Sequence, residues 1–123
     1  MNIKRVMDQE EKIASVFSKE AVITDVQSAL DMMMTVQYET GAKRIAVNKE
    51  AFSEQFFILS SGLAGEILQK FVQYRVKLAV YGDYSKYTSK PLRAFISESN
   101  RGRDIFFTDI GNSLRSVLQG RNS

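Results

Sequence analysis

Two short segments of the chain carry side chains that could do chemistry. In the first, Ser60 and Ser61 precede Gly62 and the strongly amphipathic stretch LAGEILQKF. Serines at a helix start accept hydrogen bonds from free backbone amides, and the helix dipole favours a negative group such as phosphate at the same place. We therefore expect Ser60 or Ser61 to cap a helix. The alternative is that one of them is a regulatory phosphorylation site.

The second segment is the loop GDYSKYTSK at residues 82–90, which combines tyrosines, lysines and a serine. Ammonium groups could hold an anion there, and a ligand ring could stack on the tyrosines. The alternatives are an ordinary surface loop, or an acid–base pair between Asp83 and Glu50 or Glu54, whose separation nothing in the sequence fixes. Asp83 is expected to be a turn residue that bonds its own backbone. The candidate ligand-binding residues are Tyr84, Ser85, Lys86, Tyr87 and Lys90.

The composition excludes the commonest catalytic and metal-binding chemistry. The chain has 123 residues and contains neither Cys nor His. It therefore has no thiol nucleophile, no disulfide, no His general base, and no Cys or His ligand for zinc or haem. We expect a protein that is not an enzyme, with no cofactor and no metal site.

Charge and hydropathy indicate where the protein works. The net charge is +3, and the excess of Lys and Arg falls in the C-terminal third without forming a run. We interpret this as a solvated surface and do not expect nucleic-acid binding. The first residues lack a signal-peptide pattern, and no apolar stretch approaches the roughly 20 residues that span a bilayer. We expect a cytoplasmic protein that does not enter a membrane.

A single α/β domain must position the two segments. Hydrophobic periodicity predicts an N-terminal hairpin and then alternating helices and strands, which implies parallel strands joined by right-handed crossovers. The expected fold is a mixed sheet of about five strands with four helices packed against it. Strands are predicted at 3–7, 13–17, 44–48, 76–81 and 105–107, and helices at about 25–40, 63–72, 90–101 and 110–118, in a domain spanning 1–120 before a loose tail at 121–123.

Local signals add detail to this outline. Thr24 and Gln27 predict a capping box at the start of the first helix, and Gly41 predicts its end. Residues 21–23 would add a short extra strand, and the Met run at 32–34 is expected to fill the core. If the strands at 44–48 and 76–81 are parallel neighbours, the loops that follow them leave the same end of the sheet. The loop at 82–90 would then lie near Ser60.

Two phrases carry a family resemblance. GLAGEILQKF at 62–71 and VKLAVYGDYSKYTSKPLRAFISESNRGRDIFF at 76–107 resemble a bacterial family catalogued as domain of unknown function 4180. The resemblance extends over most of the chain. It implies a bacterial source, and the family has no established activity.

A second resemblance concerns the serine segment. The order strand, loop, Ser-Ser-Gly-Leu, helix, strand is similar to STAS domains, the anti-sigma-factor antagonist fold. Residues 60–63 match the turn at which the second STAS helix begins, whose first serine can be phosphorylated by a partner kinase. Leu59 stands where STAS domains have Asp. The resemblance implies a STAS-like regulatory or protein-interaction module with a protein partner. The alternative is a small anion- or nucleotide-binding module that uses residues 82–90, and a homodimer remains open.

Overall fold

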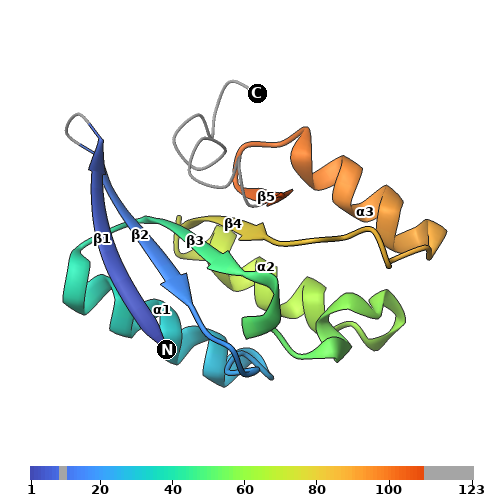
Figure 1. The fold of residues 1–123 in the computed structure, drawn as a ribbon, viewed down its shortest axis with the longest axis horizontal. Coiled ribbons are helices and arrows are strands. Elements are labelled where there is room, and N and C mark those ends of the chain that lie inside the picture. The colour runs from blue at the N-terminus through green and yellow to red at the C-terminus, as the bar shows by residue number, and fades with distance from the viewer. Residues whose placement is uncertain (9–10, 110–123) are drawn as a thin grey trace.

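A five-stranded mixed sheet organises the part of the chain that this computed structural model describes, residues 1–8 and 11–109 (Figure 1). The first two strands run antiparallel and every later neighbour is parallel. This confirms the predicted hairpin and mixed sheet. In space the strands follow their order in the sequence: β1 (Asn2–Asp8), β2 (Glu11–Phe17), β3 (Arg44–Asn48), β4 (Lys77–Tyr81) and β5 (Ile105–Thr108).

Three α-helices connect the parallel strands in the described part of the chain. Each crossover moves the chain one strand further in the same direction, so right-handed connections place all three helices on one face of the sheet. Three short 3₁₀ turns lie between β3 and the second helix. The fourth predicted helix, 110–118, and the predicted tail lie outside the described residues. The bounds are α1 (Val26–Thr40), η1 (Lys49–Ala51), η2 (Glu54–Phe57), η3 (Leu59–Ser61), α2 (Leu63–Gln73) and α3 (Lys90–Asn100).

The start of α1 differs by one residue from the predicted capping box. Asp25, and not Thr24, is the N-cap: its carboxylate accepts from the Ser28 amide at 2.8 Å. The Ser28 hydroxyl, and not Gln27, accepts from the Asp25 amide at 3.0 Å. A short hydroxyl reaches back to the cap as well as an amide does, so the same reciprocal bonding forms one position later. Gly41 ends the helix at φ 71°, as predicted.

The main core lies between the helices and one face of the sheet. Alternate strand residues, such as Ile45 and Val47, pack there with Ile67 and Phe71 of α2. The connection from β3 to α2 packs down as well, because its phenylalanines are buried. In the Met run, Met32 and Met33 are buried and Met34 is 46% exposed, so the core-filling prediction holds for two of the three. The predicted strand at 21–23 is only a single parallel bridge, between Ile23 and Phe52.

The opposite face of the sheet carries a second, smaller buried cluster. Its members are Ile13, Ala46, Ala79 and Phe106, with Tyr81 partly buried against them. None of the side chains of α1, α2 or α3 belongs to this cluster. The described helices therefore pack on one face of the sheet only.

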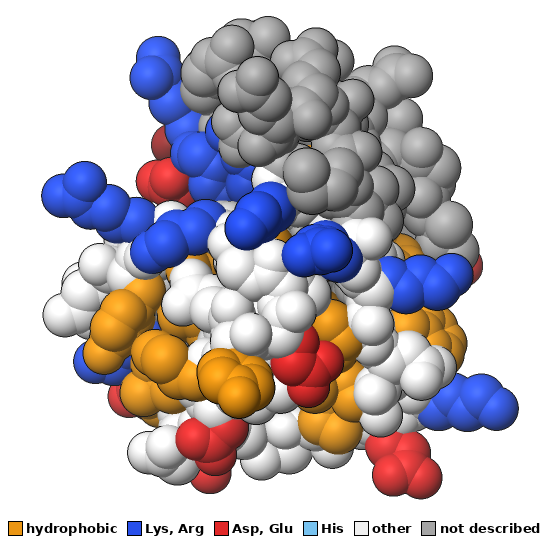
Figure 2. Space-filling view, turned by 90° about the vertical axis from the view of Figure 1, so that its left-hand side faces the viewer, with side chains coloured by type: hydrophobic (Ala, Val, Ile, Leu, Met, Phe, Trp, Pro, Cys, Tyr) orange, Lys and Arg blue, Asp and Glu red, His pale blue; other side chains and the backbone are white. Residues whose placement is uncertain are grey.

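The β1 edge of the sheet is charged. β1 contributes Lys4 and Arg5, both exposed, and Lys and Arg side chains gather above apolar ones on the side of the molecule shown in Figure 2. Charges on an edge strand oppose pairing with a strand of another molecule. Among the described residues, no helix is both long and apolar enough to cross a membrane.

Candidate functional site

The connections that follow β3 and β4 meet at the carboxyl end of the sheet through aromatic rings. Phe57 of η2 stacks on Tyr87 at a centroid distance of 5.2 Å and contacts Tyr84 at 6.3 Å. The carboxyl end of parallel strands is where open α/β sheets bind ligands. The base of the candidate site is therefore an aromatic cluster, which joins two loops that are distant in sequence.

Tyr84 forms the fixed wall of this cluster. Its hydroxyl donates to the Val80 carbonyl oxygen at 2.7 Å, and its ring packs edge-on against Phe107 at 6.1 Å. Burial raises the pKa of the Tyr84 phenol far above its ordinary value, so the side chain stays neutral. A neutral, hydrogen-bonded tyrosine is a preorganised surface for a ligand and not an acid or base.

Two ammonium groups lie near the ring of Tyr87. Lys49 Nζ is 5.2 Å and Lys86 Nζ is 5.5 Å from its ring centroid, within the range of cation–π attraction. Burial raises the pKa of Tyr87, and the nearby Glu54 carboxylate adds to this effect. The hydroxyl is buried without a hydrogen-bond partner among the described residues. The ring therefore meets two cations, while the Tyr87 backbone carbonyl oxygen accepts from Arg93 of α3.

Lys49 is a buried lysine that sequence reasoning missed. It is 6% exposed, and its ammonium lies 3.7 Å from the Glu50 carboxylate. Gly82 makes room for the lysine stem, because a Cβ there would lie 2.8 Å from the Lys49 Cβ. Asp83 accepts from the Ser85 amide at 2.9 Å, which lowers its pKa and makes it the turn residue that was expected. Its carboxylate is thus engaged in the turn.

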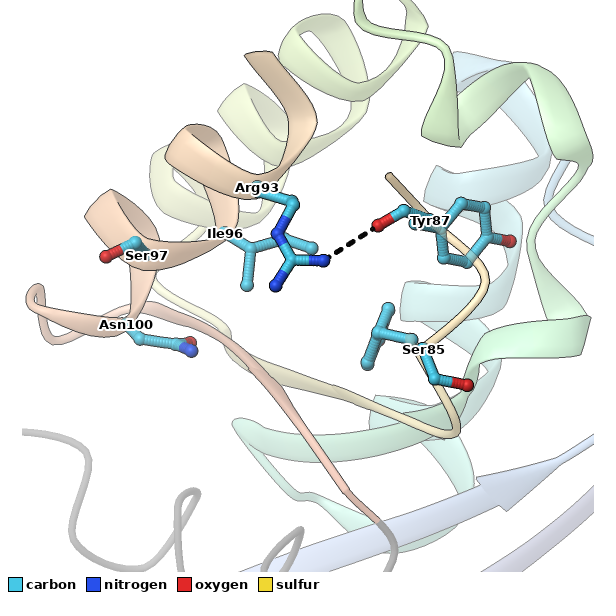
Figure 3. A pocket seen from close by; sticks show the side chains of 7 residues that line it. Ser85, Tyr87, Arg93, Ile96, Ser97 and Asn100 are labelled. Atoms are coloured by element: carbon cyan, nitrogen blue, oxygen red, sulfur yellow. Dashed lines mark hydrogen bonds between the residues drawn. The ribbon is translucent and has the colours of Figure 1, made fainter. Parts of the chain in front are cut away.

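A groove of about 460 Å³ opens between the loop after β4 and α3 (Figure 3). The Arg93 guanidinium projects from α3 toward the loop and donates to the Tyr87 carbonyl oxygen at 3.2 Å. Among the described residues, the lining contains hydroxyl, amide, guanidinium and aromatic groups, and no carboxylate. It consists of Tyr84, Ser85, Tyr87, Arg93, Ile96, Ser97 and Asn100.

The sequence-predicted loop residues divide into two groups. Tyr84, Ser85 and Tyr87 line the groove, whereas Lys86 covers the Tyr87 ring and Lys90 begins α3 outside the lining. Arg93 supplies the cation of the groove in place of the two lysines. A signal was available in the sequence: Arg93, Ser97 and Asn100 recur at the i, i+4, i+7 spacing of one helix face.

Asn100 lines the groove, but its side chain is already hydrogen-bonded to the backbone of β5. Its side-chain NH₂ donates to the Phe107 carbonyl oxygen at 2.9 Å, and its carbonyl oxygen accepts from the Phe107 amide at 2.7 Å. β5 is an edge strand, and the Asn100 amide takes the place of a neighbouring strand at Phe107. Its position therefore fixes α3, and with it Arg93, relative to the sheet.

Comparison with known proteins places the chain in a family. The family model described as a domain of unknown function (DUF4180) matches residues 8–118. The chain belongs to this DUF4180 family. No curated protein and no solved structure matches it. The resemblance to STAS domains therefore stays a prediction.

Neither serine of this DUF4180 domain takes the predicted N-cap position of α2, although Ser61 accepts a hydrogen bond from the first amide of the helix. The N-cap is Gly62, at φ 80° and without a side chain. The Ser61 hydroxyl lies one residue earlier, where it donates to the Gln55 carbonyl at 2.8 Å and accepts from the Leu63 amide at 3.2 Å. The 3₁₀ turn η3 needs a left-handed residue to join the helix, and only glycine adopts that conformation freely. Ser60 is exposed, and its side chain makes no hydrogen bond to the described residues.

The groove of this DUF4180 domain combines hydrogen-bond donors with an apolar wall. Within the described residues, no group of three or more His, Cys, Asp or Glu could hold a metal ion. Arg93 and the hydroxyls of Ser85 and Ser97 are hydrogen-bond donors that suit an anionic group. The tyrosine rings and the Ile96 side chain form the apolar part of the groove lining. No hydrogen bond or ring contact joins Ser60 to residues 82–90 in the described structure, although Phe57 reaches Tyr87.

Proposed function

We propose that this DUF4180 domain is a non-catalytic binding module whose groove beside α3 takes a small ligand with an anionic group and a ring. The observation that carries the proposal is the placing of Arg93 beside aromatic walls in a groove of about 460 Å³. That volume falls within the range of small-molecule sites. Lys86 and Lys90 lie outside the lining, and their charge favours approach of an anion.

The donors of the groove support an anion in particular. A guanidinium carries five N–H donors in a planar fork, and the contact with the Tyr87 carbonyl uses one side of it. The remaining donors suit a phosphate or carboxylate, which Arg binds in a bidentate manner. Tyr84 is held by its hydrogen bond to Val80, so a ligand ring would meet a surface that is already ordered.

The test is ligand binding by the full chain. We expect a panel of inorganic phosphate, nucleotides and aromatic carboxylates to contain compounds that raise the thermal unfolding midpoint, because ligand binding to the folded state stabilises it. Arg93→Ala should abolish the rise. The matched control is Arg101→Ala, since Arg101 leaves the same helix and pairs with Glu98 in solvent. Lys86→Ala with Lys90→Ala should weaken binding without changing the midpoint of the free protein. Equal affinity in Arg93→Ala and Arg101→Ala would remove the groove from consideration.

A second candidate function is regulated binding of a protein partner through the serine turn. It is favoured by the free, exposed Ser60 hydroxyl beside the start of α2, while Ser61 is tied to Gln55. The STAS resemblance supports this candidate, and a phosphate there would add roughly −1.5 to −2 charges to an exposed surface.

The partner candidate is tested by capture from the native host. Ser60→Asp should change the amount of one specific protein captured relative to Ser60→Ala, with both variants folded by circular dichroism. If both capture the same proteins equally well, Ser60 is not a switch.

A further inference from the structure

The amino ends of the parallel strands carry a row of four basic side chains. Each lies at or just before the start of a different strand, and all are exposed. In the order β2 to β5 they are Lys12, Lys43, Arg75 and Arg103. Because parallel neighbours begin at the same edge of a sheet, the four residues meet at the end of the sheet opposite to the loop 82–90.

Printed contacts place these strand starts beside one another. The Lys77 amide donates to the Lys43 carbonyl oxygen at 2.9 Å, and the Lys77 ammonium donates to the Arg103 carbonyl oxygen at 2.7 Å. A Cβ at Gly41 would lie 3.1 Å from the Lys12 ammonium, so Lys12 reaches the end of α1. The row crosses three strand spacings, or about 14 Å. The fold thus gathers cations that form no run in the sequence, and the lack of a run was the reason for not expecting nucleic-acid binding.

The four cations are open to a partner. Their side chains make no ion pair with the described residues. Of the acids nearby, Asp104 pairs with Lys77 at 3.2 Å and Glu98 pairs with Arg101 at 3.3 Å, whereas Glu39 is exposed. The amino ends of β3 and β4 lie toward the left of Figure 1, and the view from that side in Figure 2 shows Lys and Arg side chains in a band.

Helix dipoles alone do not explain the row. A helix C-terminus attracts cations mainly within its last turn. Neither α1 nor α3 has a basic residue in its last turn. The cations lie beyond the helices, at the strand starts, where they form a continuous positive surface.

Two exposed tyrosines accompany the row. Tyr38, in the last turn of α1, is 92% exposed, and Tyr74, the C-cap of α2, is 44% exposed. Each precedes a strand start of the row, so a ring and a cation follow one another twice along the chain. Bases of single-stranded nucleic acids stack on such rings while their phosphates pair with neighbouring cations. A duplex keeps its bases stacked on each other and cannot use the rings in this way.

We propose that this amino-end surface, the four cations with Tyr38 and Tyr74, binds single-stranded nucleic acid. The phosphates pair with the row of cations, and the bases stack on the two tyrosines. The surface lies at the other end of the sheet from loop 82–90, so it does not depend on the ligand proposed for the groove.

Fluorescence anisotropy with the full chain tests the proposal. The probe is a labelled single-stranded oligonucleotide of mixed sequence, prepared as DNA and as RNA. We expect saturable binding of at least one of them that weakens as salt is added, since each phosphate contact contributes roughly 0.7 to the slope of log K against log salt. Lys43→Glu should lower the affinity several-fold and reduce that slope. The matched control is Lys19→Glu, because Lys19 is an exposed lysine after the opposite end of β2.

The tyrosines separate stacking from charge. Tyr38→Ala should lower the affinity about fivefold or more, because it removes a stacking ring. Tyr38→Phe keeps the ring and should keep the affinity. The side chain is almost wholly in solvent, so neither change should alter the fold, and circular dichroism checks this.

Several results would overturn the proposal. They are no binding of either oligonucleotide, equal affinities of Lys43→Glu and Lys19→Glu, and an unchanged affinity in Tyr38→Ala. Duplex binding as tight as single-strand binding would overturn it too. So would binding only to vesicles that contain phosphatidylserine, which would assign the surface to an anionic membrane.

Discussion

Two asparagines show how one side chain can complete the backbone hydrogen bonds of this domain. Asn48 bonds both backbone groups of Ser18, accepting from its amide at 2.8 Å and donating to its carbonyl at 2.7 Å. Asn100 does the same for Phe107 at the β5 edge. The sites differ in exposure, because Asn48 is 1% exposed and Asn100 is open to solvent. Only at the second site is the bonding side chain itself in contact with solvent.

The expected consequence is an unequal cost of the same substitution. Asn48→Ala leaves two buried backbone groups of Ser18 without partners, at about 1–3 kcal/mol each in the free energy of unfolding. Asn100→Ala should cost less, because the exposed position of Asn100 lets water approach the Phe107 backbone groups that the side chain leaves. Urea unfolding of both variants measures the difference. Equal losses of unfolding free energy in the two variants would mean that burial does not determine how much such an asparagine stabilises the fold.

Tyr84 makes the domain sensitive to alkali. Its phenol has a raised pKa in the folded chain because it is buried, whereas in the unfolded chain it titrates near its ordinary value of about 10. The folded state therefore keeps a proton that the unfolded state loses, and this contribution is complete below about pH 10 and declines as the pH rises above it.

Tyr84→Phe should flatten that decline. The free energy of unfolding of the wild type should fall above about pH 10 by up to roughly 1.4 kcal/mol per pH unit from this group alone. The variant starts lower, because it loses the hydrogen bond to Val80, but it should fall less steeply. Tyr38→Phe is the control, since Tyr38 is 92% exposed. Parallel stability curves for the wild type and Tyr84→Phe would contradict the assignment.

At the scale of elements, α2 shows how far apolar spacing predicts packing. Within the helix predicted at 63–72, apolar residues recur at helical spacing, and four of them, Ala64, Ile67, Leu68 and Phe71, are buried. The same spacing reaches Val72, which is 48% exposed, because spacing alone does not say where the covering elements end. The start of the helix was misjudged for a related reason. Two serines before a glycine suit an ordinary cap, and only the folded η3 turn shows that the glycine itself takes that position.

Leu68 and Val72 therefore make a matched test of the α2 face. Leu68→Ala removes a buried side chain and should lower the free energy of unfolding by roughly 2–5 kcal/mol. Val72→Ala, one turn further along the helix, should cost well under that, because its side chain is half in solvent. Chemical denaturation measures both. Similar midpoints for the two variants would show that the buried face is wrongly assigned.

Only part of the groove could be predicted from the sequence. Its aromatic half could be predicted, because tyrosines in a loop at the carboxyl end of parallel strands have few other places to pack. Its cation was missed, because Lys86 and Lys90 carry the same charge as Arg93, and the helical spacing of Arg93 with Ser97 and Asn100 does not say where that helix face points. Which cation enters the groove depends on the orientation of α3, and the two hydrogen bonds between Asn100 and the Phe107 backbone fix that orientation. Lys49 was missed because a lysine after a strand gives no sign of burial.

At the scale of the molecule, stability should rise from the β1 edge toward the centre of the sheet. β3 and β4 have neighbours on both sides and are largely buried on both faces, whereas β1 is an edge strand with exposed Lys4 and Arg5. Opening the centre requires most of the core to open, so native-state hydrogen exchange should be slowest in β3 and β4 and fastest in β1. Amides of β1 that exchange as slowly as those of β3 would contradict this gradient.

The sequential strand order has a consequence for how the chain can assemble during synthesis. Each parallel strand joins the sheet beside the strand made before it, so no strand has to be inserted between two that are already paired. The sheet can therefore grow at one edge only, one helix and strand at a time, in the direction in which the ribosome releases the chain. Each addition closes a single crossover connection with its helix, so no strand has to find a partner further away in the sequence than the preceding strand.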